Sequence, residues 1–435
     1  MRTKGRHFIV RILSLSVVLL ILGLSSVATG QTLKLATAST TSPQASTAAG
    51  TYFDHVVVVI MEDHGIQQIC GSSPPPCQST MGAPYMAGLA NSYAIGSQYL
   101  GVTHYSQADY LAMLGGTTDN CSSAGCPWPF NGPNLVDSLE TAGLTWKGYM
   151  ENQNMASGCD LTYHQPYTPE HNPFVGFTDI VNSPTRCSQI VLANPSGCSV
   201  TDCPLINDLN SGSAPNFMWL TPNNCDNMHG FTYTNGTVLC PTSVSFGDYY
   251  LSSLIPNILK STTFTTQRSA LFVVFDEGNG YCPLNQSTTE DCVYAVWAGP
   301  LAKANYGTTN LYNHYSWLRT VEVNWNLQAL TSNDASATPM AEFFTANPLS
   351  ASFTYSPSNP APVLAVTFTA SATGGTQPYS YNWDFGDGFT SNGQSVSHSY
   401  LLPGTYTVTL TVNDANGATV STSQTVTVSI PILGL

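Results

Sequence analysis

The chain has 435 residues, enough for two or three domains and a sizeable buried core. Its formal net charge is −14, and beyond residue 30 only seven Lys or Arg remain against 25 Asp or Glu, a balance of −18. This negative balance excludes the cationic surface that a nucleic-acid-binding protein needs, so no nucleic acid is expected as a partner.

Charged residues are scarce throughout and make up only 8% of the chain. A surface of Ser, Thr, Asn, Gln and Tyr changes little in acid, whereas acid unfolding acts largely through carboxylates that are paired in the native state. The composition therefore favours an acidic habitat.

The first thirty residues have the pattern of an export signal. Four basic residues precede an apolar run over residues 12–24, and small residues follow at Ser26, Ala28 and Gly30. Because the run is close to the length of a membrane anchor, residues 1–30 are expected to be a signal peptide or an N-terminal anchor. The protein is then secreted or held at the extracellular cell surface, and no further transmembrane segment is expected.

Residues 31–50 are rich in Ser, Thr and Ala without periodicity, which indicates a flexible linker. The twelve cysteines that follow indicate a disulfide framework, because the number is even and the chain carries an export pattern. The absence of a C-x-x-C pair makes a zinc site the weaker interpretation. Four pairs of nearby cysteines could form disulfides that close short loops: Cys70 with Cys77, Cys121 with Cys126, Cys198 with Cys203, and Cys282 with Cys292.

The first predicted element is a strand over residues 55–61, HVVVVIM. A continuous β-branched run suits a central parallel strand that helices cover on both faces. The strand ends in the polar cluster Glu62, Asp63 and His64. Open α/β sheets bind ligands at the carboxyl ends of their strands, so this cluster is a candidate site.

After a predicted helix over residues 83–93, the sequence GVTHYSQADY indicates a turn and a helix that begins at or just after Ser106. Backbone N–H groups at a helix start lack intrahelical partners, so an anion can dock beside this hydroxyl. The commoner role of a serine at such a place is that of an N-cap. His104 and Asp109 lie close to it on either side.

Strands and helices then alternate, which predicts an α/β sandwich up to about residue 345. The second fully apolar strand, residues 270–275, ends like the first in an acidic pair, Asp276 and Glu277. The remaining predicted strands cover residues 144–150, 216–220 and 294–298, and the remaining predicted helices cover residues 135–142 and 315–325.

Two acidic pairs at the ends of two buried strands would converge on one edge of the sheet. Glu62, Asp63, Asp276 and Glu277 offer hard oxygen ligands that suit a divalent cation, whose identity and number the sequence leaves open. Either pair alone could also consist of cap or turn residues. Two carboxylates could instead cleave a glycoside, but that chemistry does not explain the accompanying serine and histidines.

Histidine is sparse, with nine in the chain. Singly, His171, His229 and His314 are more often ordinary surface or hydrogen-bonded residues. Asp226 and His229 would face the same point if their segment forms one helical turn. With so few Lys and Arg, the charge of a bound phosphate would have to be met by a metal, imidazole and backbone N–H groups.

From residue 350 the composition changes: Cys is absent, and Thr, Ser and Val dominate. Strict alternation over residues 405–412 predicts a half-buried antiparallel strand, and the spacing of Gly-rich turns is typical of a β-sandwich. The sequence WDFGDG at residues 383–388 resembles the signature of a PKD-type repeat. This resemblance implies a small all-β, Ig-like sandwich over residues 350–430 that acts as a spacer or adhesion module.

Six blocks resemble, in the same order, the motifs of the phosphoesterase family that contains bacterial phospholipases C and the AcpA-type acid phosphatases. The blocks are VVIMEDH at 58–64, THYSQADYLA at 103–112, EHNPF at 170–174, NNCDNMHG at 223–230, FDEG at 275–278 and NHYSWLRT at 313–320. The resemblance implies an alkaline-phosphatase-like α/β/α sandwich over residues 51–345.

The resemblance also implies a metal-assisted mechanism with a phosphoserine intermediate on Ser106. The implied metal ligands are Glu62, Asp63, Ser106, Asp276 and Glu277. The implied contacts to phosphate oxygens or the leaving group are His171, His229 and His314, and the implied orienting residues are His104, Asp109 and Asp226. The chain departs from the family pattern at Asp63, where Asn is usual, and at Tyr105, Ala108 and Asp109, where Pro, Pro and Asn are usual.

The sequence thus predicts an exported, metal-dependent acid phosphatase that acts on phosphomonoesters. A phospholipase C-like phosphodiesterase is the alternative within the class. A non-catalytic surface adhesion or carbohydrate-binding protein is the alternative from another class. A phosphate ester is the expected partner, and a lipid or a cell-surface polysaccharide is the further candidate.

Overall fold

The computed structural model describes residues 50–430, with gaps at 73, 81, 119–120, 122–125, 127, 279–281, 283–291, 346–348, 376 and 416. The predicted signal, and all of the predicted linker except residue 50, lie outside the described residues. None of the helices in the described ranges has the length and apolar character needed to span a membrane.

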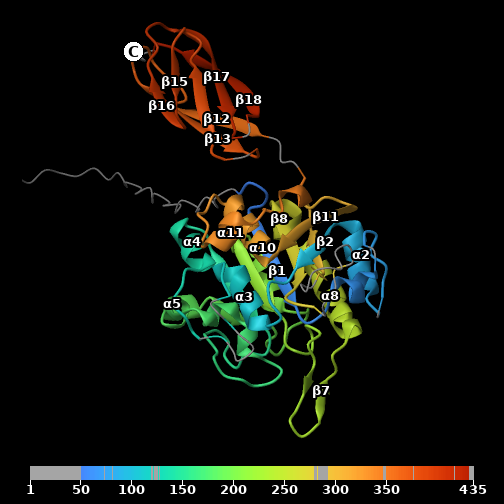
Figure 1. Ribbon diagram of the computed structural model, residues 1–435. Coiled ribbons are helices and arrows are strands. Elements are labelled where there is room, and N and C mark those ends of the chain that lie inside the picture. Colours follow the sequence, from blue (N-terminus) through green and yellow to red (C-terminus); the bar gives the residue numbers. More distant parts are fainter. Residues whose placement is uncertain are drawn as a thin grey trace, which may run out of the picture. The chain divides into compact units, whose positions relative to one another are not determined.

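The larger part of the chain is built around one sheet of nine strands (Figure 1). Its order is β11-β2-β10-β8-β1-β5-β3-β4, and β9 pairs with β2. The strands are β1 (His55–Met61), β2 (Ala94–Leu100), β3 (Trp146–Met150), β4 (Ile190–Leu192), β5 (Phe217–Thr221), β8 (Ser269–Phe275), β9 (Cys292–Val293), β10 (Ala295–Ala298) and β11 (Tyr306–Asn313).

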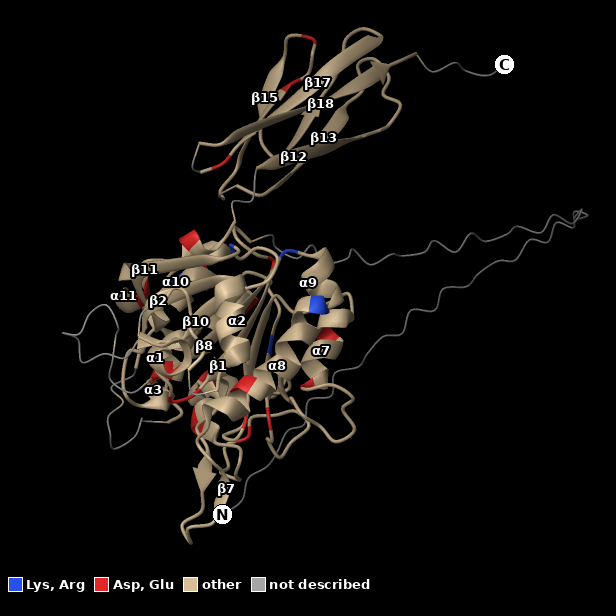
Figure 2. Cartoon of the chain, turned by 90° about the vertical axis from the view of Figure 1, so that its right-hand side faces the viewer, with Lys and Arg blue, Asp and Glu red and all other residues tan. Residues whose placement is uncertain are grey.

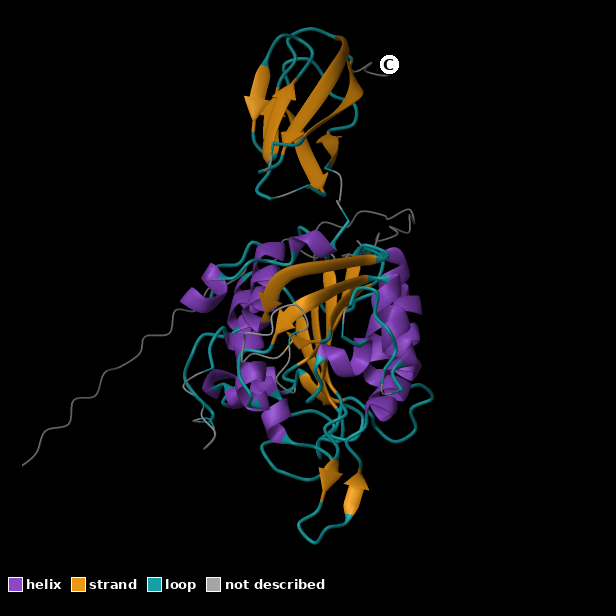
Figure 3. Ribbon diagram, turned by 45° about the vertical axis from the view of Figure 1, so that its right-hand side comes forward, coloured by secondary structure: helices purple, strands orange, loops and turns teal. Residues whose placement is uncertain are grey.

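Helices cover both faces of this sheet, which confirms the predicted α/β sandwich (Figure 3). They are α1 (Ile66–Cys70), α2 (Pro84–Ser92), α3 (Ser106–Gly115), α4 (Leu135–Thr141), α5 (Thr178–Val181), α6 (Pro184–Cys187), α7 (Cys203–Asn210), α8 (Val244–Lys260), α9 (Thr262–Thr266), α10 (His314–Asn324) and α11 (Ser332–Ser336). Short 3-10 turns lie at Pro169–His171, Pro173–Gly176 and Ala341–Phe343.

The central strand β1 lies between β5 and β8 and is parallel to both. All seven of its side chains are buried, as the continuous apolar run predicts. Full burial of a Val or Ile side chain stabilises the fold by about 1.5–3 kcal/mol relative to an exposed one. Met61 and Phe275, the last residues of β1 and β8, pair with each other. The residues that follow them, Glu62 and Asp276, therefore lie side by side at the carboxyl edge of the sheet.

The sheet is mixed rather than parallel throughout. Strand β10 runs antiparallel to both of its neighbours, β8 and β2. Beyond β10, β2 and β11 again pair in parallel, and β11 forms an edge with several exposed side chains. Strands β2, β4, β9 and β11 of this sheet are not among those that the sequence predicts.

Residues 350–428 form a sandwich of two antiparallel sheets, which confirms the predicted all-β domain. One sheet has β12 (Ser350–Ser356), β13 (Val366–Thr373) and β16 (Ser395–His398). The other has β14 (Ser380–Asp384), β15 (Thr390–Asn392), β17 (Gly404–Asn413) and β18 (Thr419–Val428). Alternate residues of β17 point inward, and they pack around the buried Trp383 and Phe368 in a core of their own.

Six disulfides close loops of the larger domain. Four are the local pairs that the sequence predicts: Cys70–Cys77, Cys121–Cys126, Cys198–Cys203 and Cys282–Cys292. The other two, Cys159–Cys187 and Cys225–Cys240, join more distant residues.

Candidate active site

Ser106 is the first residue of α3, and Tyr105 holds the N-cap position without a side-chain cap. The Ser106 hydroxyl lies 3.2 Å from Glu62 Oε2 and 3.0 Å from Glu277 Oε1, and it can donate to either. The hydroxyl therefore faces two carboxylates instead of capping the helix. The simpler N-cap role does not apply here.

The carboxylates come from the ends of β1 and β8, where the register places them together. The Asp63 N–H donates to Asp276 Oδ1 over 3.1 Å, which ties the two strand ends to each other. Asp63 has φ +57, a backbone conformation that Asn and Asp tolerate better than most residues. Asp276 Oδ2 is buried and accepts no hydrogen bond from any described residue.

Burial and mutual repulsion disfavour negative charge on these groups. Burial, followed by repulsion from Glu62 and Glu277, raises the pKa of Asp276 well above its usual range. Burial likewise raises the pKa of Glu62 to about 7, although nearby His229 opposes the shift. A positive partner would reverse both shifts, because an opposite charge within a few ångströms favours the ionised form.

Among the described residues, Lys and Arg do not supply that partner. Figure 2 shows Asp and Glu around the ends of β1 and β8 near α1 and α3, with no described Lys or Arg drawn beside them. Several basic side chains of the described ranges form their ion pairs elsewhere: Lys147 with Asp208, Arg186 with Glu140, Arg268 with Asp54, and Arg319 with Glu322.

A metal would suit the chemistry of this oxygen cluster. Asp276 offers a buried oxygen without a donor, and Glu62 and Glu277 converge on one hydroxyl. Across the described ranges, however, no three His, Cys, Asp or Glu side chains already form a metal cage. The donor atoms thus fit a divalent cation in type and charge, while their present arrangement is that of an open site.

Tyr110 and His171 hold the Glu62 carboxylate from the other side. The Tyr110 hydroxyl donates to Glu62 Oε1 over 2.6 Å, and His171 Nε2 lies 3.5 Å from the same oxygen. The two rings are stacked, with centroids 5.5 Å apart. Burial, with a smaller effect of His229, lowers the pKa of His171 to about 3, so this imidazole is neutral.

His229 reaches the site from the turn after β5. Its Nε2 lies 3.7 Å from Asp63 Oδ2, and its side chain is partly exposed. Burial alone would lower its pKa, but Glu62 and the Gly230 carbonyl outweigh burial, and the pKa is raised. His229 can therefore carry a proton at the mouth of the site.

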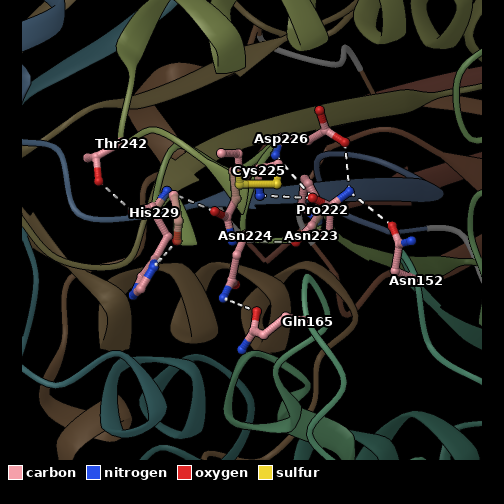
Figure 4. The surroundings of a disulfide bond; sticks show 12 residues. Asn152, Gln165, Pro222, Asn223, Asn224, Cys225, Asp226, His229 and Thr242 are labelled. Atoms are coloured by element: carbon pink, nitrogen blue, oxygen red, sulfur yellow. Dashed lines mark hydrogen bonds between the residues drawn. A yellow bond between two sulfur atoms is a disulfide. The ribbon is translucent and has the colours of Figure 1, made fainter. Parts of the chain in front are cut away.

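Asp226 does not share this position. Its segment is a turn rather than a helical one, and its carboxylate accepts a hydrogen bond from Asn223 Nδ2 at 2.7 Å. In Figure 4 the side chains of Asp226 and His229 point away from each other. The expectation that both face one point is therefore wrong, because it assumed helical geometry.

His314 lies behind the site, where it has no exposed surface. Its Nε2 lies 2.6 Å from the Asp276 carbonyl oxygen and 3.5 Å from Asp109 Oδ1, and its Nδ1 lies 3.1 Å from the Tyr99 hydroxyl. Burial lowers its pKa to about 4. In this position it cannot grip a phosphate oxygen, and it orients the Asp276 backbone instead.

Asp109 and His104 flank the turn at Ser106, as their places in the sequence suggested. Asp109 is buried, and its Oδ1 accepts the N–H groups of Val102 and Thr103 at 2.8 and 3.0 Å. It thereby fixes the turn that leads into α3. His104 is more than half exposed, and its Nδ1 lies 3.9 Å from Glu277 Oε2 at the rim.

Sequence reasoning missed Tyr110 and Asn227 as site residues. Tyr110 lies one helical turn after Ser106, so the i, i+4 spacing on a helix could have indicated it. Asn227 accepts the Glu62 N–H with its carbonyl oxygen at 2.9 Å and the His229 N–H with Oδ1 at 2.9 Å. Its link to Glu62 joins residues far apart in the chain, and no local pattern signals it.

The chain is similar to known proteins over the same region. A model of the Phosphoesterase family matches residues 78–328, and a model of the PKD domain matches residues 346–430. The first match includes Ser106, His229 and Asp276, and it begins after Glu62 and Asp63.

Two curated relatives and one solved structure illustrate the similarity. A probable acid phosphatase of Kluyveromyces lactis is 28% identical over 55% of this chain and 53% of its own length. The phosphatidylinositol-3-phosphatase of Mycobacterium tuberculosis is 28% identical over 66% of this chain and 82% of its own length. An alkaline phosphatase superfamily protein of Vibrio parahaemolyticus is 13% identical over 88% of this chain and 85% of its own, with a TM-score of 0.44. The chain spans about half the length of the fungal acid phosphatases that it matches.

Proposed function

Because the chain belongs to the phosphoesterase family, we propose that it hydrolyses phosphomonoesters at the site around Ser106. The observation that carries this proposal is the Ser106 hydroxyl at the start of α3, 3.0 Å from Glu277 Oε1 and 3.2 Å from Glu62 Oε2. A carboxylate beside a hydroxyl can take its proton, and the free N–H groups of a helix start favour an anion next to it.

In the proposed reaction, Ser106 Oγ bonds to phosphorus while the bond from phosphorus to the alcohol oxygen breaks. The serine proton passes to a neighbouring carboxylate, and the departing alcohol oxygen takes a proton from His229. Water then cleaves the phosphoserine, which releases inorganic phosphate and restores the hydroxyl. His229 suits the donor role because it is partly exposed and its pKa is raised.

His171 and Tyr110 have a different part in this scheme. The neutral His171 ring and the Tyr110 hydroxyl both lie against Glu62 Oε1. They hold the carboxylate so that its other oxygen faces Ser106. His171 contributes through this contact, or by donating a hydrogen bond to a phosphate oxygen from Nε2.

We further propose that the site works with a divalent cation. Glu62, Asp63, Ser106, Asp276 and Glu277 would hold it. When bound, a divalent cation would lower the pKa of the serine hydroxyl and offset the phosphate charge. The buried, donor-free Asp276 Oδ2 supports this proposal most directly.

A phosphomonoester on a lipid is a second candidate substrate, and the relative named phosphatidylinositol-3-phosphatase favours it. Phosphodiester cleavage, as in a phospholipase C, remains the alternative chemistry. Turnover of p-nitrophenyl phosphate, bis-p-nitrophenyl phosphate, phosphatidylcholine and phosphatidylinositol 3-phosphate separates these functions. Hydrolysis of a monoester that Ser106→Ala abolishes is the expected result. A non-catalytic adhesion protein would hydrolyse none of them.

We also propose that the protein is secreted or bound to the cell surface. Six disulfides fit a protein that folds in an oxidising compartment. The PKD domain would then serve as a spacer or bind a surface polysaccharide. Localisation of the full chain in cell fractions tests the first point, and a pull-down on insoluble polysaccharides tests the second.

A further inference from the structure

The segment that follows His229 forms a hairpin of β6 (Phe231–Thr232) and β7 (Val238–Cys240), which projects beyond the sheet in Figure 1. The two strands pair with Phe231 opposite Cys240. Cys240 also forms the disulfide with Cys225, which lies in the turn before His229 (Figure 4). The hairpin is thus tied back to the turn that carries a proposed catalytic residue.

His229 is held through its own backbone on both sides. Its N–H donates to Asn227 Oδ1 at 2.9 Å, and its carbonyl oxygen accepts the Thr242 hydroxyl at 2.8 Å. The imidazole Nδ1 lies 2.8 Å from the Gly230 carbonyl oxygen. This last contact turns Nε2 toward Asp63, so the direction of the ring depends on where the hairpin begins.

The base of the hairpin closes very tightly against this segment. Gly230 has φ +73, and a Cβ atom there would lie 2.3 Å from the Thr242 backbone nitrogen. No larger residue fits without moving one chain segment away from the other. The Gly230 N–H also donates to the Asn224 carbonyl oxygen at 2.6 Å, directly beside the disulfide.

We propose that the Cys225–Cys240 disulfide and Thr242, together called the hairpin brace, position the His229 imidazole at the site around Ser106. The brace residues are positioning residues, because they act through the His229 backbone and touch no substrate. The inference rests on the role proposed for His229. It adds that the activity requires this disulfide to be intact.

The brace holds the carbonyl side of His229, whereas the turn before it holds only the N–H side. Asn227 anchors the N–H side and also receives the Glu62 N–H, so that side is tied to the sheet. On the other side, the carbonyl oxygens of His229 and Gly230 belong to the chain entering the hairpin. Without the disulfide, the returning chain that carries Thr242 is tied to that segment by the Thr242 hydroxyl and by the short pairing of β6 and β7. A displacement of about 1 Å can cost roughly a hundredfold in rate.

Two variants remove parts of the brace, and each has a matched control. C225S/C240S opens the disulfide, and C198S/C203S opens another short-range disulfide, at the start of α7. Thr242→Val removes only the hydroxyl bond to His229, and Thr237→Val makes the same change on the exposed hairpin turn. For each variant, kcat and KM are measured with p-nitrophenyl phosphate at a temperature where it is folded. Every variant is made both alone and in combination with His229→Asn.

The brace variants are expected to lower kcat by about tenfold or more with little change in KM, while both controls stay within about twofold of the wild type. In the His229→Asn background the brace variants should cause no further loss. Wild-type kcat in both brace variants overturns the inference, and so does an equal loss in the His229→Asn background. If His229→Asn itself is fully active, the role proposed for His229 fails, whatever the brace variants do.

Discussion

The Tyr110 hydroxyl donates a hydrogen bond of 2.6 Å to Glu62 Oε1, one helical turn after the serine that faces Glu62 Oε2. Both contacts come from α3, and the carboxylate comes from the end of β1. One buried carboxylate therefore joins α3 to the central strand of the sheet. Its orientation depends on both oxygens being held.

Removal of the Tyr110 hydroxyl should impair catalysis more than stability. Tyr110→Phe removes the hydrogen bond that Glu62 Oε1 accepts and leaves His171 Nε2 3.5 Å away, so the carboxylate can rotate away from Ser106. We expect kcat to fall by about tenfold or more and the unfolding free energy to fall by about 1–2 kcal/mol. Tyr149→Phe is the control, because that buried hydroxyl also donates to a carboxylate, Asp208, at 2.6 Å. Equal losses of kcat in both variants would contradict the account.

The carboxylate cluster predicts a stability response to divalent cations. Burial raises the pKa of Asp276 well above its usual range, so in chelator folding must pay for protonating this carboxyl. Asp276→Asn removes that cost, so the variant should unfold at a higher temperature than the wild type in chelator. Added divalent cation should raise the unfolding temperature of the wild type, because a ligand of the native state stabilises it. The variant should show a much smaller rise. Calorimetry with and without chelator reads this out without any activity assay, and identical responses would remove support for the metal site.

A second buried acidic pair predicts how stability depends on pH. The Leu330 N–H lies 3.2 Å from Glu322 Oε1 and 2.6 Å from Asp334 Oδ2, so one donor serves two carboxyl groups. Burial, followed by Asp334, raises the pKa of Glu322 to about 8, although Arg319 opposes the shift.

A raised pKa in the folded state means that the native protein binds this proton more tightly than the unfolded chain does. The resulting stability is complete below the unfolded pKa of Glu322, 4.5, and is lost as the pH rises through about 8. Glu322→Gln should flatten the fall in unfolding free energy across that window, as urea titrations can show. An unchanged slope in Glu322→Gln would rule out this proton as the cause.

Substitution of His314 should lower the unfolding free energy more than substitution of His229. His314 is fully buried and contacts the Asp276 carbonyl oxygen and the Tyr99 hydroxyl, so His314→Ala leaves a cavity and unpaired groups. We expect a loss of about 2–4 kcal/mol of unfolding free energy. His229→Ala, at a partly exposed position, should cost less than about 1 kcal/mol. Denaturant unfolding measures both, and the reverse order would contradict the placement of His314 behind the site.

The sequence predicted the centre of the sheet well and its edge poorly. Strands β1 and β8 are continuous apolar runs, and only a fully buried strand of that length explains them. Strand β11 reads YGTTNLYN and is half exposed, so its polar residues resemble a loop. Helix α8 carries Pro256 in its interior and was also missed, although its buried face is regular. The antiparallel direction of β10 leaves no mark in a local pattern.

The same contrast holds for the site. The convergence of Glu62 and Asp276 follows from two neighbouring parallel strands, and a sequence can reveal that arrangement. The burial of His314 depends on which face of α10 packs on the sheet, and the divergence of Asp226 from His229 depends on a turn. Neither is visible in residue spacing. The hydrogen bond between Asn227 and Glu62 depends on tertiary contact alone.

The most direct test of the central claim is to trap the reaction at Ser106. The enzyme is mixed with a phosphomonoester, quenched in acid, digested and analysed by mass spectrometry for a phosphorylated peptide. We expect a phosphate on Ser106 in the wild type, none in Ser106→Ala, and loss of turnover in that variant. Wild-type turnover by Ser106→Ala, with no phosphopeptide from either protein, would contradict that claim.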